Sequence, residues 1–162
     1  MKHKESDLQI RFIKWFRYQY PAYARLIEHP HNEGNAFNRR QQAIAKAEGV
    51  TVGVADIILH VPSLIPNKVN DMMCVISTSL AIELKSPTGT QSPEQKIWQR
   101  MFEAAGGLYI IGRDFDEMVS FTTRYMLNVP VGVDKAVKDA YAQIIAEEDA
   151  KAVAMLKKIT KE

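Results

Sequence analysis

Two charged residues, Glu83 and Lys85, stand inside the apolar segment LAIELKSP, which runs from Leu80 to Pro87. The segment has the pattern of a buried β-strand, in which alternate side chains point to the same face of the sheet. Glu83 and Lys85 therefore share a face. Burying a charge is costly unless it is paired or bound to a metal. Mutual attraction is one explanation, although side chains two residues apart are expected to pair imperfectly; a solvated strand face is another.

A second carboxylate makes a chemical site the better explanation. Asp56 begins the apolar segment DIILHV shortly after Gly53. If the two strands are neighbours, Asp56 and Glu83 converge at one end of the sheet, where they repel each other unless a proton or a cation lies between them. Mg²⁺ or Mn²⁺ suits ligands that are all oxygen. The ammonium of Lys85 would then face a phosphate or a metal-bound water.

Hydrophobic periodicity predicts the elements that must position these residues. Ser92, Pro93 and Gln95 form a strong helix start, and Asn38 with Gln41 forms a second capping-box pattern. The expected elements are a helix over 6–20, a strand over 24–29, a helix over 38–48, a strand over 53–62, an extended region over 72–85, a helix over 93–105, a strand over 108–112 and a helix over 115–127. The order predicts an α/β fold with a central mixed sheet flanked by helices.

A domain boundary is predicted at Pro130 and Gly132. Residues 1–129 would form one domain, and residues 130–162 a helical tail that opens at Asp134. The tail has three interpretations, which the sequence leaves open: a packed helix, a dimer contact or a loose appendage.

Composition excludes several classes of protein. The chain has 162 residues, 46% of them hydrophobic and 25% charged, with a net charge of +2 and one cysteine. This composition is typical of a globular domain rather than a disordered one, and one cysteine cannot form an internal disulfide. No apolar run is long enough to span a membrane, no signal peptide is visible, and no P-loop or dinucleotide fingerprint occurs. We therefore expect a cytoplasmic protein without a nucleotide cofactor.

The motifs together resemble a known family. They are G-x-x-D at Gly53–Asp56, IELK over 82–85, and SPEQKIW opening a helix at Ser92. This combination resembles the VRR-type nucleases (VRR-NUC domains) of the PD-(D/E)XK restriction-endonuclease-like superfamily, over roughly Glu5 to Met126. The resemblance implies a restriction-endonuclease-like core. Ala55 departs from the pattern, because a proline usually precedes the aspartate.

The resemblance also implies roles for particular residues. Asp56, Glu83 and the backbone carbonyl of Leu84 match the metal ligands, and Lys85 matches the residue that orients or activates the attacking water. Gln95 matches a glutamine on the following helix. Glu5 matches a glutamate on the first helix that often completes the metal site. Ser6 and Gln9 look like a capping box, which would leave Glu5 just outside that helix.

Residues before Asp56 are candidates for binding nucleic acid. Asn32, Asn35, Arg39 and Arg40 suit phosphate contacts, and they suit a solvated face equally well. His29 and His31 (HPH) lack two further metal ligands, so we expect a loop near the substrate. Trp98 and Phe102 are expected to pack in the core rather than to stack on bases.

The resemblance implies an endonuclease that hydrolyses DNA phosphodiester bonds with Mg²⁺ or Mn²⁺. It further implies a small homodimer acting on branched DNA such as a Holliday junction. Two alternatives remain open from the residues alone: a non-catalytic nucleic-acid-binding or assembly module on the same fold, and a sequence-specific restriction nuclease.

Overall fold

The structure is a computed structural model that describes residues 2–30, 39–69 and 73–159. The chain divides into two compact units, Met1–Val129 and Pro130–Glu162. The second unit contains the long helix α5 (Val131–Ile159). This helix begins directly after Pro130 rather than at Asp134, in keeping with the preference of proline for the start of a helix.

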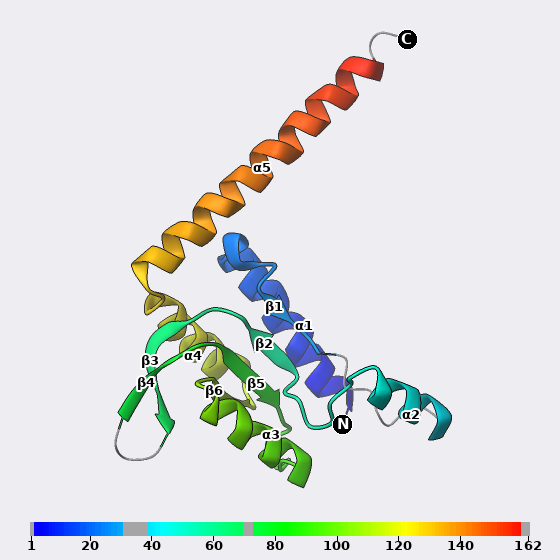
Figure 1. Cartoon of the computed structure of the whole chain (residues 1–162), viewed down its shortest axis with the longest axis vertical. Coiled ribbons are helices and arrows are strands. Elements are labelled where there is room, and N and C mark those ends of the chain that lie inside the picture. Colours follow the sequence, from blue (N-terminus) through cyan, green and yellow to red (C-terminus); the bar gives the residue numbers. More distant parts are fainter. Residues whose placement is uncertain (1, 31–38, 70–72, 160–162) are drawn as a thin grey trace. The chain divides into compact units, whose positions relative to one another are not determined.

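A four-stranded sheet forms the centre of the first unit, in the order β1-β2-β5-β6 (Figure 1). Its strands are β1 (Ile27–Glu28), β2 (Ile57–Leu59), β5 (Leu80–Leu84) and β6 (Leu108–Gly112). β2 is antiparallel to β1 and to β5, whereas β5 and β6 are parallel. The predicted α/β class with a central mixed sheet is confirmed.

A hairpin occupies the segment that the sequence predicts as a connection and the start of an extended region. β3 (Ser63–Val69) and β4 (Met73–Ser77) pair antiparallel in a separate sheet. Pro66 favours a connection, but it lies at an irregularity in the register, where a strand tolerates proline. Ser63 and Ser77 are buried, and their hydroxyls donate to the carbonyl oxygens of Tyr125 (2.9 Å) and Ile65 (2.6 Å). The hairpin is thus tied to the rest of the unit.

Helices complete the first unit: α1 (Lys2–Gln19), α2 (Arg39–Ala47), α3 (Pro93–Ala104) and α4 (Phe115–Leu127), with a 3₁₀ turn η1 (Pro21–Tyr23). The predicted capping box of α3 is present, because Ser92 Oγ accepts from the N–H of Gln95 and the Gln95 side chain accepts from the N–H of Ser92. Asp114 caps α4 by accepting from two N–H groups of its first turn. The capping box predicted at Asn38 lies outside the described residues.

The first helix begins earlier than predicted. α1 starts at Lys2, so the expected capping box of Ser6 and Gln9 is wrong and Glu5 lies within the first turn. A carboxylate there interacts favourably with the helix dipole. Phe12 and Phe16 are fully buried and anchor the helix.

Helices cover both faces of the central sheet. On one face, Trp98 and Phe102 of α3 stack with ring centroids 4.7 Å apart and pack against a buried cluster that includes Ala81 and Tyr109. On the other face, α4 packs so closely that a Cβ at Gly112 would lie 2.6 Å from the sulfur of Met118, and α1 contacts α4. Trp98 and Phe102 therefore lie against the core, as the sequence predicts.

Candidate active site

The two predicted carboxylates come from neighbouring strands. Ile57 of β2 faces Ile82 of β5 in the antiparallel register. Asp56, directly before β2, consequently lies beside the end of β5, where its Oδ2 accepts from the N–H of Leu84 at 2.7 Å. The strands thus bring Asp56 to the segment that carries Glu83 and Lys85.

Gly53 explains the spacing of the G-x-x-D motif. Its φ is +84°, a conformation that favours glycine. A Cβ at this position would lie 2.6 Å from the backbone carbonyl carbon of Glu94, in the first turn of α3. Only glycine lets the loop pass this close to α3. The segment that leads into Asp56 therefore packs directly against the helix that carries Gln95.

Glu83 is the most buried charged residue of the described site, with 1% of its surface exposed. Its Oε1 accepts from Lys85 Nζ at 2.6 Å and from the side-chain amide of Gln95. The hydroxyl of Tyr109 donates to Oε2 at 3.3 Å. The expectation that Glu83 and Lys85 pair imperfectly is therefore wrong, because the flexible lysine side chain folds back to a direct ion pair.

Hydrogen bonds extend from Glu83 along the face covered by α3. The side-chain amide of Gln91 donates to the hydroxyl of Tyr109 at 3.2 Å and to Gln99 at 2.8 Å. Tyr109 is itself buried. A buried carboxylate held by three donors has a restricted orientation, the more so because two of these donors, Tyr109 and Gln95, have further hydrogen-bond partners in Gln91 and Ser92.

Burial makes both carboxylates harder to ionise. The pKa of Glu83 is raised to about 7, chiefly by burial and further by repulsion from Asp56, while hydrogen bonds from Lys85 and Tyr109 oppose the rise. The pKa of Asp56 is also raised, chiefly by burial, against the lowering effect of the Leu84 N–H. A cation beside them would favour the ionised forms.

We expect the protein in EDTA to lose stability as the pH rises through the ionisation of Glu83. Its pKa is about 7 in the folded protein against an ordinary 4.5, so folding favours the protonated form. This stabilisation is complete below pH 4.5 and falls by about 2 kcal/mol between roughly pH 5 and 8. Thermal melting at the two pH values measures the loss. The same slope in Glu83→Gln would contradict the assignment to Glu83.

Glu5 and Arg113 hold the residue that follows Lys85. The N–H of Ser86 donates to Glu5 Oε1 at 2.7 Å, and the guanidinium of Arg113 donates to the carbonyl of Ser86 at 2.5 Å. Glu5 also lies close enough to Asp56 to raise the pKa of that carboxyl by charge repulsion. The first helix therefore brings a third carboxylate to the same end of the sheet.

These groups fit a hard divalent cation in donor type. Asp56, Glu83 and Glu5 offer carboxylate oxygens. The carbonyl of Leu84 lies on the same edge of β5 as the Leu84 N–H, which donates to Asp56. Among the described residues, no donor bonds to the second oxygen of Asp56 or of Glu5. The same residues contain no group of three or more His, Cys, Asp or Glu that could hold a metal ion. Coordination therefore stays a prediction.

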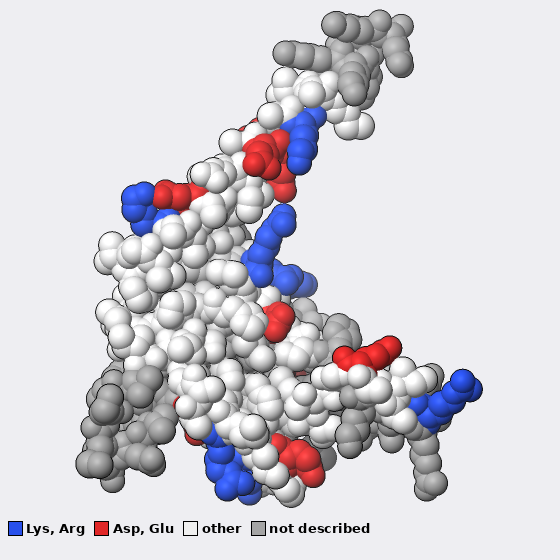
Figure 2. All heavy atoms as spheres, viewed as in Figure 1, with Lys and Arg blue, Asp and Glu red and all other residues white. Residues whose placement is uncertain are grey.

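Several candidates are not brought to this cluster. Arg40 is exposed on α2, and no contact joins it to the described carboxylates. Asn32, Asn35 and His31 lie outside the described residues, as does the side chain of Arg39. Figure 2 shows one face of the molecule, on which basic and acidic side chains are interspersed. His29 does lie beside the site, since its Nδ1 donates to the backbone oxygen of Asp56 at 2.6 Å.

Sequence reasoning missed Tyr109, Gln91 and Arg113. Tyr109 had a usable signal, because it is the only residue with a hydrogen-bonding side chain in the apolar segment LYIIG, and a buried tyrosine hydroxyl usually has a partner. That partner depends on the register of β6 against β5, which pairs Ala81 with Tyr109. Gln91 and Arg113 lie in connections and carry no such signal.

Comparison with known proteins identifies a similar fold. A solved structure named "VRR_NUC domain protein" superposes with a TM-score of 0.59 and 19% sequence identity, covering 77% of this chain and 89% of that chain. The chain has the fold of that protein. No family model and no curated protein matches the sequence. At this identity the similarity concerns the fold alone. No helix of the described residues is long and apolar enough to cross a membrane.

Proposed function

We propose that the protein is a metal-dependent endonuclease that hydrolyses phosphodiester bonds in DNA. The observation that carries the proposal is the buried Glu83, held by Lys85 and Gln95 next to Asp56. The fold shared with a protein named for a VRR_NUC domain supports it. A pair of neighbouring carboxylates with raised pKa values, one of them fully buried, is costly for stability, and such arrangements cluster at functional sites.

Each residue of the proposed site has a role. Asp56, Glu83 and the Leu84 carbonyl would hold the cation, with Glu5 completing its environment. Bound Mg²⁺ or Mn²⁺ supplies a Lewis acid and lowers the pKa of water. Lys85, whose side chain is 15% exposed, would donate to the attacking water or neutralise charge developing on the phosphate. Gln95 and Tyr109 keep Glu83 oriented.

Tyr109→Phe should weaken Mn²⁺ binding about tenfold, because residues that orient a ligand contribute this much to metal affinity. Calorimetric titration measures the change. Tyr125→Phe is the matched control, since Tyr125 is also buried but its hydroxyl donates to the Val61 carbonyl at 2.7 Å. The control should lose about 1 kcal/mol of stability and keep its Mn²⁺ affinity. Equal Mn²⁺ affinities for the two variants would show that Tyr109 does not position Glu83.

The proposed substrate is branched DNA, with a four-way junction as the first choice. A junction has two-fold symmetry, which a homodimer with two sites would match. Asn32, Arg39 and Arg40 are the proposed phosphate contacts, together with Lys85. Incubating the protein and Mg²⁺ with linear, flapped and four-way DNA of equal length tests the preference. We expect the four-way junction to be cut fastest, and equal rates on all three would contradict structure selectivity.

The second candidate is a non-catalytic nucleic-acid-binding or assembly module on the same fold. This candidate would use the same carboxylate cluster to bind nucleic acid or a protein partner without cleaving a phosphodiester bond. Calorimetric titration with Mn²⁺ separates the two candidates. The nuclease should bind Mn²⁺ and lose this binding in Asp56→Asn, whereas the module should show no binding that depends on Asp56.

A further inference from the structure

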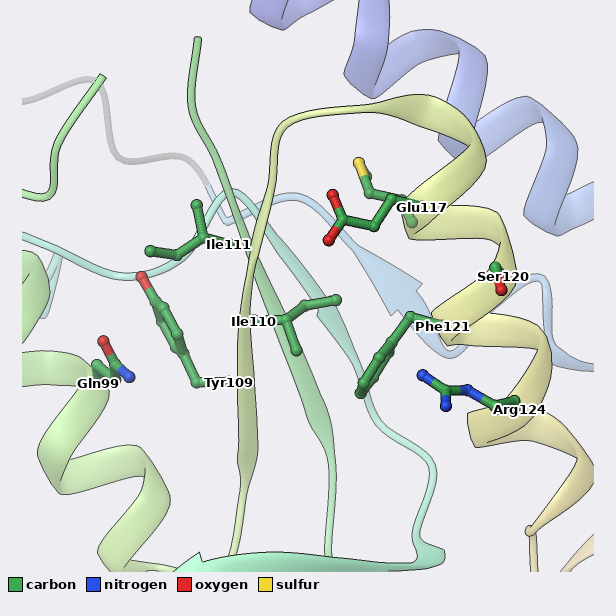
Figure 3. A pocket seen from close by; sticks show the side chains of 9 residues that line it. Gln99, Tyr109, Ile110, Ile111, Glu117, Ser120, Phe121 and Arg124 are labelled. Carbon is green, nitrogen blue, oxygen red and sulfur yellow. The ribbon is translucent and has the colours of Figure 1, made fainter. Parts of the chain in front are cut away.

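A pocket of about 560 Å³ lies along the outer edge of β6 and shares Tyr109 with the carboxylate cluster. β6 is the last strand of the central sheet, and the pocket runs between α3 and α4 on either side of it. Figure 3 shows Tyr109 and Ile111 on one side of the pocket and Ile110, Phe121 and Arg124 on the other. A groove with a sheet edge at its base is suited to receive another strand.

The backbone of β6 has the hydrogen-bonding groups that a further strand would need. Leu108 donates inward to Ser79 and Gly112 accepts inward from Lys85. Since alternate residues of a strand bond to the same neighbour, the N–H and C=O groups of Tyr109 and Ile111 point outward. Among the described residues, none of these outward groups has a backbone partner.

Within β6 itself, the sequence and the register contain no lysine, proline or bulge that would hinder strand pairing. Exposed edge strands usually carry lysine, proline, a bulge or a covering loop. β6 has the sequence LYIIG and pairs in a regular register along its five residues. Such an edge is expected to be covered by a partner in solution.

The charges of α4 indicate which partner fits. Glu117 and Arg124 both line the pocket and both are exposed. They lie two helical turns apart, about 10 Å along the axis, which is too far for them to pair within one helix. Phe121 lies between them on the same face, with the Arg124 guanidinium carbon 5.6 Å from its ring centroid. The groove is therefore acidic at one end, apolar in the middle and basic at the other.

We propose that this groove is the interface between two copies of the chain, joined through antiparallel β6 strands. A two-fold axis through Ile110 sets Tyr109 of one copy opposite Ile111 of the other, so all their outward N–H and C=O groups pair. The same axis makes the α4 helices antiparallel and sets Glu117 of each copy opposite Arg124 of the other. A two-fold interface must be self-complementary, and both the backbone and the charges of this groove meet that condition.

Charge reversal tests the proposal, with the mass of the full chain measured by light scattering during size-exclusion chromatography. The wild type should be a dimer. Glu117→Arg and Arg124→Glu each set like charges opposite each other twice, and each should weaken association at least about tenfold. The double variant restores opposite charges and should restore the dimer. Asp139→Lys on α5 is the control, because Asp139 is exposed and lies in the other unit; its dimer should persist.

Three results would overturn the proposal. A monomeric wild type would leave the groove to another partner, such as an extended peptide. A dimer that neither reversal weakens would place the interface elsewhere. Single variants that dissociate without recovery in the double variant would exclude this two-fold register. The outcome is independent of the proposed nuclease activity, since the assay measures mass and not cleavage.

Discussion

Replacing Asp56 with Asn or Glu83 with Gln should lower the rate of cleavage of a four-way junction by at least about a thousandfold. Each change removes a negative charge that the proposed cation requires while keeping the shape of the side chain. Both variants should stay folded. Stability in EDTA should rise, because each carboxylate has a pKa raised by burial and the change removes repulsion within the pair.

A matched carboxylate outside the cluster controls for this result. Asp116 is exposed on α4, and Asp116→Asn should cut at the wild-type rate. Initial rates of cleavage of a labelled junction compare the wild type with the variants, and circular dichroism checks that each variant is folded. Wild-type rates in both purified site variants would exclude Asp56 and Glu83 from catalysis.

Lys85→Ala should reduce the cleavage rate about a hundredfold and weaken DNA binding no more than about threefold. Lys85 is the only ammonium that contacts Glu83 in the described structure. Its loss therefore removes a charged donor at the place where the reacting phosphate would lie. One phosphate contact among several contributes modestly to affinity. Single-turnover rates and fluorescence anisotropy separate the two effects.

Lys96→Ala is the control for Lys85, since Lys96 is exposed next to Gln95 on α3. This variant should keep both the rate and the affinity. If Lys85→Ala lost rate and affinity in equal proportion, Lys85 would hold the DNA rather than act in the reaction.

Local signals made much of the fold predictable. The capping residues Ser92 and Asp114 specify the starts of α3 and α4 through short-range hydrogen bonds, and the apolar segments around Asp56 and Glu83 mark two central strands. That these two strands are neighbours was only a condition of the site prediction, and it is the pairing of Ile57 with Ile82 that establishes it. The face shared by Glu83 and Lys85 followed from strand alternation.

Long-range features could not be predicted in the same way. The hairpin of β3 and β4 is stabilised by a hydrogen bond from Ser63 to Tyr125, which is far along the chain. The local sequence argues against a strand there, because it contains Pro66. The early start of α1 accompanies the contact of Glu5 with Ser86. The roles of Tyr109 and Arg113 depend on how β6 lies against β5. The position of β6 at the edge of the sheet depends on the order of the strands, and the hydrophobic pattern of the sequence does not specify that order.

The cleavage of a labelled four-way junction as a function of Mg²⁺ concentration tests whether the protein is a metal-dependent endonuclease. We expect no product in EDTA and a wild-type rate that rises with Mg²⁺ and saturates. The double variant Asp56→Asn, Glu83→Gln, purified in parallel, should give no product at any Mg²⁺ concentration. A wild type that never cuts with Mg²⁺ or Mn²⁺ would exclude the proposed nuclease activity, and a double variant that cuts as fast as the wild type would exclude Asp56 and Glu83 as its metal ligands.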